Sequence, residues 1–168
     1  EITDALMLTL RELVPRREYS LLLEDLMWRA ALRADQDSFE RGQRHQLRGN
    51  AMERRLVLLE PLAEGDLTTW DRQIRRGLRD NPNETVQFLE QLALRLELED
   101  ERVRQAHVPT LRAVIELLAP LLEGDPRGRT ARKAAELEDK VLAILEGLDH
   151  LLFVFALLVL IRRPGRLV

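Results

Sequence analysis

The sequence predicts an all-α protein, and three properties of the chain support that class. Apolar residues make up 45% and charged residues 33% of the 168 residues, whereas aromatic residues make up only 4%. Leu, Ala, Glu and Arg dominate, and these side chains lose little rotamer freedom in a helix. Apolar positions also recur at helical spacing along most of the chain. We therefore expect a helical bundle followed by a C-terminal helical hairpin whose last helix is long and apolar.

Two helices are expected at the start of the chain. Thr3 can serve as the N-cap of the first, and Val14-Pro15 ends it because the residue before a proline disfavours helical geometry. A second helix is expected over residues 16–34, with Trp28 in the core. Its buried stripe follows the i, i+3, i+4, i+7 pattern and consists of Tyr19, Leu22, Leu23, Leu26 and Ala30.

Residues 34–50 form a polar connector that contains two glycines. A short helix capped by Asp37 or Ser38 is expected within it. The connector is basic because it carries Arg41, Arg44, His45 and Arg48. Such a segment is either a solvated surface loop or a site for phosphate or for an acidic partner, and both interpretations stay open.

The next stretch, residues 49–84, predicts a pair of amphipathic helices. Asn50 is the expected N-cap of the first helix. Pro61 predicts a kink or a break near Glu60, because proline removes a hydrogen bond inside a helix and clashes with the preceding turn. Gly65 is expected to end the helix in a left-handed conformation, and Asp66 to cap the next helix.

The second helix of this pair carries four arginines on one side. The apolar residues Leu67, Trp70, Ile74 and Leu78 are expected to point inward. The outward stripe consists of Arg72, Arg75, Arg76 and Arg79. Two interpretations are open: a solvated face with intrahelical ion pairs, or a docking surface for an acidic partner, since arginine binds carboxylates through two parallel hydrogen bonds.

A domain boundary is expected after this helical pair and the helix that follows it. Asn81-Pro82-Asn83 ends the pair, and Asn83 is expected to cap a helix reaching Leu96. The charged run over residues 97–107 fits either a continuous helix or a linker. We expect one domain over residues 1–98 and a second over 99–168. The acidic surface that could meet the arginines consists of Glu97, Glu99, Asp100 and Glu101.

The C-terminal part is expected to form two helices joined by a loop over residues 123–130. Pro109 suits the first turn of one helix, and the other is expected over residues 130–163. Residues 151–161 are eleven consecutive apolar residues, about 17 Å of helix, which is short of the ~30 Å hydrocarbon core. The run either is buried, within the protein or in an oligomer, or inserts into or associates with a membrane. Its expected face consists of Leu151, Leu152, Phe153, Phe155, Leu158 and Leu160.

No motif in the chain indicates catalysis or cofactor binding. Cysteine is absent, and the three histidines are isolated from one another in sequence. Glu146 and His150 have a spacing found among metal ligands, but a hydrogen-bonded pair is favoured because two ligands do not make a site. The net charge of −3 disfavours nucleic-acid binding. We expect that the protein is not an enzyme and that it binds no metal, cofactor or small-molecule substrate. We expect it instead to bind a protein partner or to associate with itself.

The N-terminus lacks the basic region of a signal peptide. Together with the absence of cysteine, this favours a cytoplasmic location. Association with the inner membrane through the apolar C-terminal helix is the alternative.

The helical pair resembles the bacterial effector-associated domains, helical adaptors of the death-like superfamily found in prokaryotic conflict and cell-death systems. The resemblance depends on GNAMERRLVLLEPLAEGDLTTWDRQIRRGLRDNPNE, where Gly49-Asn50, Ala63-Glu64-Gly65 and Asn81-Pro82-Asn83 match the motifs of that family. The apolar Leu56, Leu59, Leu67 and Ile74 match too. Pro61 and the long connector depart from the family pattern. The resemblance implies a six-helix bundle that acts as a non-enzymatic adaptor by homotypic or heterotypic association.

A second and shorter resemblance covers residues 147–163, GLDHLLFVFALLVLIRR. This stretch is similar to the first membrane span of the hydrogenase/urease accessory membrane proteins. It implies an affinity for membranes, and it provides the alternative function of a membrane-associated helical subunit or small effector.

Overall fold

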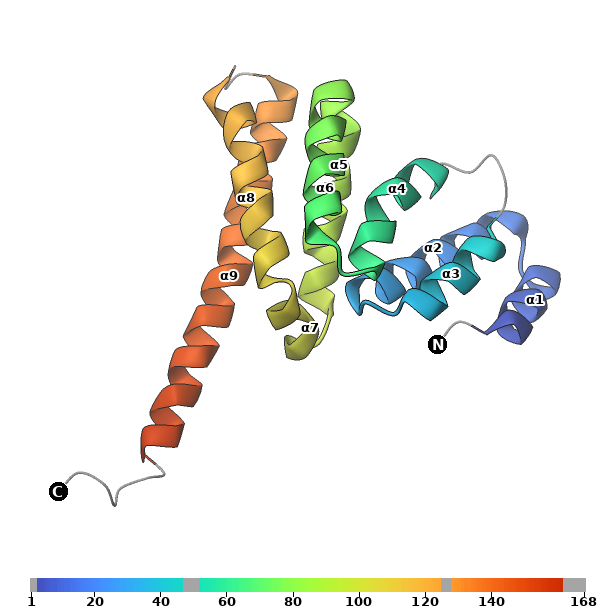
Figure 1. Ribbon diagram of the computed structural model, residues 1–168, viewed down its shortest axis with the longest axis horizontal. Helices are drawn as coiled ribbons and strands as arrows, with labels where there is room; N and C mark the ends of the chain where they lie inside the picture. Colours follow the sequence, from blue (N-terminus) through green and yellow to red (C-terminus); the bar gives the residue numbers. More distant parts are fainter. Residues whose placement is uncertain (1–2, 47–51, 125–127, 162–168) are drawn as a thin grey trace. The chain divides into compact units, whose positions relative to one another are not determined.

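The computed structural model describes residues 3–46, 52–124 and 128–161, and every regular element in these ranges is an α-helix (Figure 1). The predicted all-α class is confirmed. The chain divides into two compact units, one ending at Thr85 and the other beginning at Val86. This division falls near the start of a helix, whereas the boundary expected from the sequence lies at residue 98.

The first unit contains α1 (Asp4–Leu13), α2 (Arg16–Leu32), α3 (Gln36–Arg44), α4 (Met52–Ala63), α5 (Leu67–Asp80) and the start of α6 (Pro82–Leu98). The helix α2 packs against α3 and α4, and α4 packs against α5. Of the stripe predicted on α2, Leu22 is 44% exposed and is not part of the core. The largest fully buried side chains of this unit are Trp28, Trp70, Tyr19, Phe39, Met7, Met27, Leu59 and Ile74.

Helix ends in the first unit follow local capping rules. The side chain of Thr3 accepts a hydrogen bond from the N–H of Leu6, and α1 ends before Val14, as predicted. The cap predicted for α3 is wrong, because Asp35, not Asp37 or Ser38, accepts the hydrogen bond from the Ser38 N–H at 3.0 Å. The chain turns at Ala34, whose φ is 50°, and this early turn starts α3 sooner than expected.

Of the kink or break predicted near Glu60, the break does not occur, since α4 continues through Pro61 to Ala63. Pro61 has no N–H to donate, but its carbonyl oxygen accepts the N–H of Asp66 at 2.8 Å. The N–H of Gly65 donates to the carbonyl oxygen of Leu62 at 3.1 Å, and Gly65 has a φ of +71°. These two bonds form a Schellman motif, which closes α4 with the left-handed glycine that the sequence predicts.

Two further predicted caps have different outcomes. Asn50 lies outside the described residues. Asn83 does not cap α6 but lies inside its first turn, because α6 begins at Pro82. Proline suits the first helical position since its missing N–H would have no partner there. The carbonyl oxygen of Asn81 accepts the N–H of Thr85 at 3.1 Å and so begins the helix.

The second unit contains the rest of α6 with α7 (Glu101–Ala106), α8 (Val108–Glu123) and α9 (Arg129–Ile161). The charged run over residues 97–107 is therefore neither one helix nor a plain linker. The helix α8 packs along α9, and Pro109 lies in the first turn of α8 as predicted. Buried residues recur along α9 at helical spacing: Ala131, Ala134, Leu137, Val141, Ile144 and Leu148.

Two ion pairs connect α6 to α9. The ammonium of Lys133 lies 3.9 Å from Glu90, and that of Lys140 lies 3.2 Å from Glu97. The pairs occur in the same order along both helices, so α6 and α9 run in the same direction where they meet. Both pairs are partly exposed, and their contribution to stability is therefore modest.

Candidate interaction surfaces

The start of α5 is fixed by Asp66. Its carboxylate accepts the N–H of Thr69 at 2.9 Å and the hydroxyl of the same residue at 2.6 Å. These bonds, the side-chain bond first, hold the pKa of Asp66 below its usual value of 3.8. The predicted cap is confirmed, and it fixes the residue at which α5 begins.

The buried side of α5 is held by Trp70 and Ile74, both 0% exposed. The four arginines predicted to point outward are all exposed: Arg72, Arg75, Arg76 and Arg79. Their i, i+3, i+4, i+7 spacing places them on one side of the helix. We refer to these four residues as the arginine face.

Two members of the arginine face form ion pairs within α5. In Arg75, Nε donates to one carboxylate oxygen of Asp71 at 2.7 Å, and Nη2 donates to the other at 3.3 Å. Nε of Arg76 lies 3.5 Å from the carboxylate of Asp80. The positive charge of Arg72 contributes weakly to lowering the pKa of Asp66, after the hydrogen bonds of Thr69. Intrahelical pairing thus occupies part of the face.

The predicted acidic set lies in the second unit and takes part in local interactions. Glu97 pairs with Lys140 at 3.2 Å. Asp100 is the N-cap of α7, where its carboxylate accepts the N–H of Val103 at 3.0 Å, and Glu101 lies 3.1 Å from Arg104. The remaining member, Glu99, is partly buried. Glu97, Asp100 and Glu101 thus also make contacts within the second unit.

The predicted apolar face of the C-terminal helix is described for one side chain. Residues 151–161 continue α9, and Phe153 is 62% exposed. The side chains of Leu151, Leu152, Phe155, Leu158 and Leu160 lie outside those that the structure describes. Over residues 3–46, 52–124 and 128–161, no helix is both long and apolar enough to cross a membrane.

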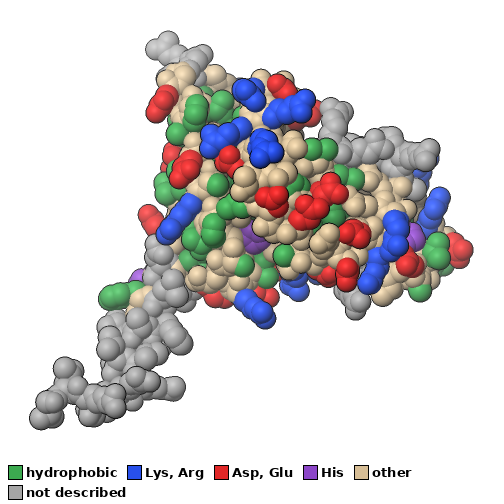
Figure 2. Space-filling view, in the orientation of Figure 1, with side chains coloured by type: hydrophobic (Ala, Val, Ile, Leu, Met, Phe, Trp, Pro, Cys, Tyr) green, Lys and Arg blue, Asp and Glu red, His purple; other side chains and the backbone are tan. Residues whose placement is uncertain are grey.

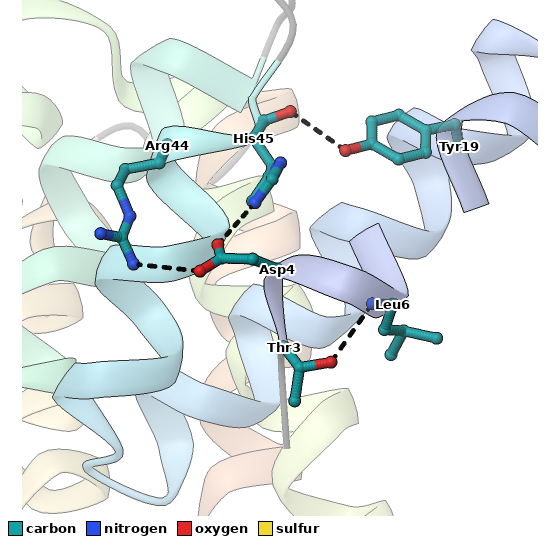
Figure 3. A network of polar contacts seen from close by, with 6 residues as sticks. All are labelled: Thr3, Asp4, Leu6, Tyr19, Arg44 and His45. Carbon is teal, nitrogen blue, oxygen red and sulfur yellow. Dashed lines mark hydrogen bonds and ion pairs between the residues drawn. The ribbon is translucent and has the colours of Figure 1, made fainter. Parts of the chain in front are cut away.

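A polar cluster between α1 and the end of α3 was not predicted from the sequence (Figure 3). Nε2 of His45 lies 2.7 Å from Oδ1 of Asp4, and Arg44 lies 3.9 Å from the other carboxylate oxygen. The hydroxyl of Tyr19 donates to the backbone carbonyl oxygen of His45 at 3.2 Å. The hydrogen bond with His45, followed by the charge of Arg44, holds the pKa of Asp4 below its usual value.

This cluster gives two of the basic connector residues a structural role. Met7 is the buried residue of α1, so the polar contacts of Asp4 add a second attachment for that helix. Arg44 and His45 therefore already have an acidic partner, Asp4, within the first unit. Nothing in the local sequence signals the contact, since His45 and Asp4 are separated by 41 positions.

Side chains of both signs are interspersed over the face drawn in Figure 2. Within the described part of the chain, no three His, Asp or Glu residues gather in a group that could hold a metal ion. No family model, curated protein or solved structure matches the chain. The fold places the chain in the class of all-α helical proteins.

Proposed function

We propose that this chain is a non-enzymatic adaptor that assembles helical domains, either with copies of itself or with partner effectors. The arginine face is the observation on which the proposal depends. It is exposed on a helix whose opposite side is fully buried at Trp70 and Ile74. Rigid helices that present several arginines suit partners with clustered carboxylates, because the guanidinium group binds a carboxylate through two hydrogen bonds.

The resemblance to bacterial effector-associated domains gives the proposal its setting, a bacterial defence or cell-death system. The described part of the first unit supplies five helices and the first turn of a sixth. This number is compatible with the six-helix death-like bundle that the resemblance implies. The capped turn at Gly65 and Asp66, which belongs to the resembling stretch, is well formed and supports the proposal.

Charge reversal at the arginine face tests the adaptor function. Arg75→Glu combined with Arg76→Glu should shift the protein from a larger assembly toward the monomer, because the face would then repel a carboxylate partner. Light scattering over a range of protein concentrations measures the assembly state.

A matched control is Arg16→Glu with Arg17→Glu, which makes the same charge change at exposed positions in the first turn of α2. We expect the control to keep the assembly of the wild type. A wild type that stays monomeric at every concentration would contradict self-assembly. Equal effects of the two double variants would show that net charge, not the face, is responsible.

The second candidate function is that of a membrane-associated helical subunit, and the exposure of Phe153 favours it. Phe153 is 62% exposed and belongs to a run of eleven consecutive apolar residues, and a helix with such a segment is suited to a membrane surface. We expect the protein to float with phospholipid vesicles. Phe153→Glu should reduce the floating fraction at least several-fold, because a charged side chain is unfavourable in an apolar environment.

Leu142→Glu provides the comparison for this variant, since Leu142 is on the same helix and is 40% exposed, but lies before the apolar run. It should float like the wild type. Wild-type protein that remains entirely with the unbound fraction, for both zwitterionic and anionic vesicles, would rule out this second function.

A further inference from the structure

The four residues of the arginine face are not equivalent. Arg75 and Arg76 each meet an aspartate of their own helix. For Arg72 and Arg79, no hydrogen bond or ion pair of the side chain occurs within the described residues. Each pair with Asp71 or Asp80 is locally neutral, so the positive charge of the face that no ion pair neutralises lies at Arg72 and Arg79, of which Arg72 acts weakly on Asp66.

The geometry of the Arg75 pair strengthens this distinction. Nε and Nη2 together bind both oxygens of Asp71, so the edge of the guanidinium that would bind a partner's carboxylate is already occupied. A partner would have to displace Asp71 before it could use this edge. Arg72 and Arg79 can bind without such an exchange.

The spacing of the two free arginines defines the form of the partner. Seven residues correspond to about two helical turns, so Arg72 and Arg79 project from nearly the same side of α5 at positions about 10.5 Å apart along its axis. A helix lying alongside α5 matches this spacing when its own carboxylates are seven residues apart. The spacing favours an acidic helix over a single carboxylate, which could meet one arginine only.

We propose that Arg72 and Arg79 form a two-point docking site for an acidic helix whose carboxylates are seven residues apart. This proposal rests on the adaptor function, and it names the chemistry of the partner and the residues that bind it. Ile74 lies between the two arginines and Trp70 lies just before them, and the burial of both side chains holds this part of α5 in place. The site is therefore organised before the partner arrives, which lowers the entropy cost of binding.

Two synthetic helical peptides test the spacing. Both are alanine-rich, labelled with a fluorophore and equal in composition, but one carries glutamates seven residues apart and the other carries them five residues apart, on different sides of the helix. Fluorescence anisotropy at low salt measures their affinities. We expect the seven-residue spacing to bind up to about fivefold more tightly, because it allows one more exposed ion pair than the five-residue spacing.

Two double variants of equal charge test the residues. Arg72→Ala with Arg79→Ala should abolish the preference for the seven-residue spacing. Arg75→Ala with Arg76→Ala, the matched control, should retain most of it, because these arginines are already paired within α5. All four side chains are exposed, so neither variant should lose its fold, and circular dichroism checks this.

The outcomes separate the docking site from the adaptor function. Equal losses in both variants, or equal affinities for both peptides, would overturn the two-point site and leave a general basic surface. No binding of either peptide by the wild type would overturn it as well. The assembly measured by light scattering is independent of these titrations, so the adaptor function can fail while the docking site holds, and the reverse.

Discussion

Trp70→Ala is expected to destabilise the first unit by about 3–5 kcal/mol, the range for removing a large aromatic side chain from a core. Trp70 is 0% exposed and lies on α5, which packs against α4. Its removal takes away apolar contacts and leaves a cavity that the neighbouring helices fill only in part. Urea denaturation followed by circular dichroism measures the change in the free energy of unfolding.

A second substitution at this position separates packing from hydrogen bonding. Nε1 of Trp70 is buried and has no hydrogen-bond partner among the described residues. Trp70→Phe keeps much of the apolar contact and removes the unpaired N–H, so it should cost clearly less than Trp70→Ala.

Leu13→Ala is the control for these variants, since Leu13 is apolar but 76% exposed in the same unit. We expect little change from it. An effect of Trp70→Ala no larger than that of Leu13→Ala would mean that α5 is not anchored by its buried side. The support of the arginine face would then need a different explanation.

The features that the sequence predicts well are those governed by neighbouring residues. Thr3, Gly65 and Asp66 act at helix ends through contacts a few positions away, so their roles can be recognised from local patterns. Helical spacing likewise predicts the burial of Trp70 and the exposure of the arginines. The ion pair between Asp71 and Arg75 follows the i, i+4 rule and was one of the two interpretations of that face.

Errors in the local prediction arise where two rules compete. The missing N–H of Pro61 predicted a break in the helix. Pro61 lies near the end of α4, however, where the two Schellman bonds form around it and the helix continues. Asn83 is a good N-cap in isolation, yet Pro82 already occupies the first position of α6. In both cases the position of the residue relative to the helix end decides the outcome, and that position cannot be read from the residue type.

Contacts between distant parts of the chain could not be predicted from one sequence. The pairing of Asp4 with His45, and that of Glu97 with Lys140, depend on how whole helices pack. In both cases members of a predicted surface also make contacts within their own unit. Two connector residues contact Asp4 of α1, and one member of the acidic set pairs with α9.

Gly77→Ala is expected to destabilise the protein by about 1–3 kcal/mol, although alanine is the better helix former. A Cβ atom at this position would lie 2.6 Å from Oγ1 and 3.2 Å from Cγ2 of Thr85. Thr85 is 4% exposed, and its hydroxyl donates to the carbonyl oxygen of Asn81 at 2.9 Å. A threonine is stiff at χ1, so moving it would break this bond and bury an unpaired hydroxyl.

The effect of Gly77→Ala on stability should change sign in a protein that also carries Thr85→Ala. Thr85→Ala removes both clashing atoms, Oγ1 and Cγ2. The Cβ atom of residue 85 remains, and it would lie 3.5 Å from the Cβ atom added at position 77, which is an ordinary contact. In that background Gly77→Ala should stabilise the protein by up to about 1 kcal/mol, the difference in helix propensity. A double-mutant cycle from urea denaturation measures both effects. If Gly77→Ala destabilised both backgrounds equally, the close approach of Thr85 would not be the reason for glycine here, and the backbone of α5 itself would have to require it.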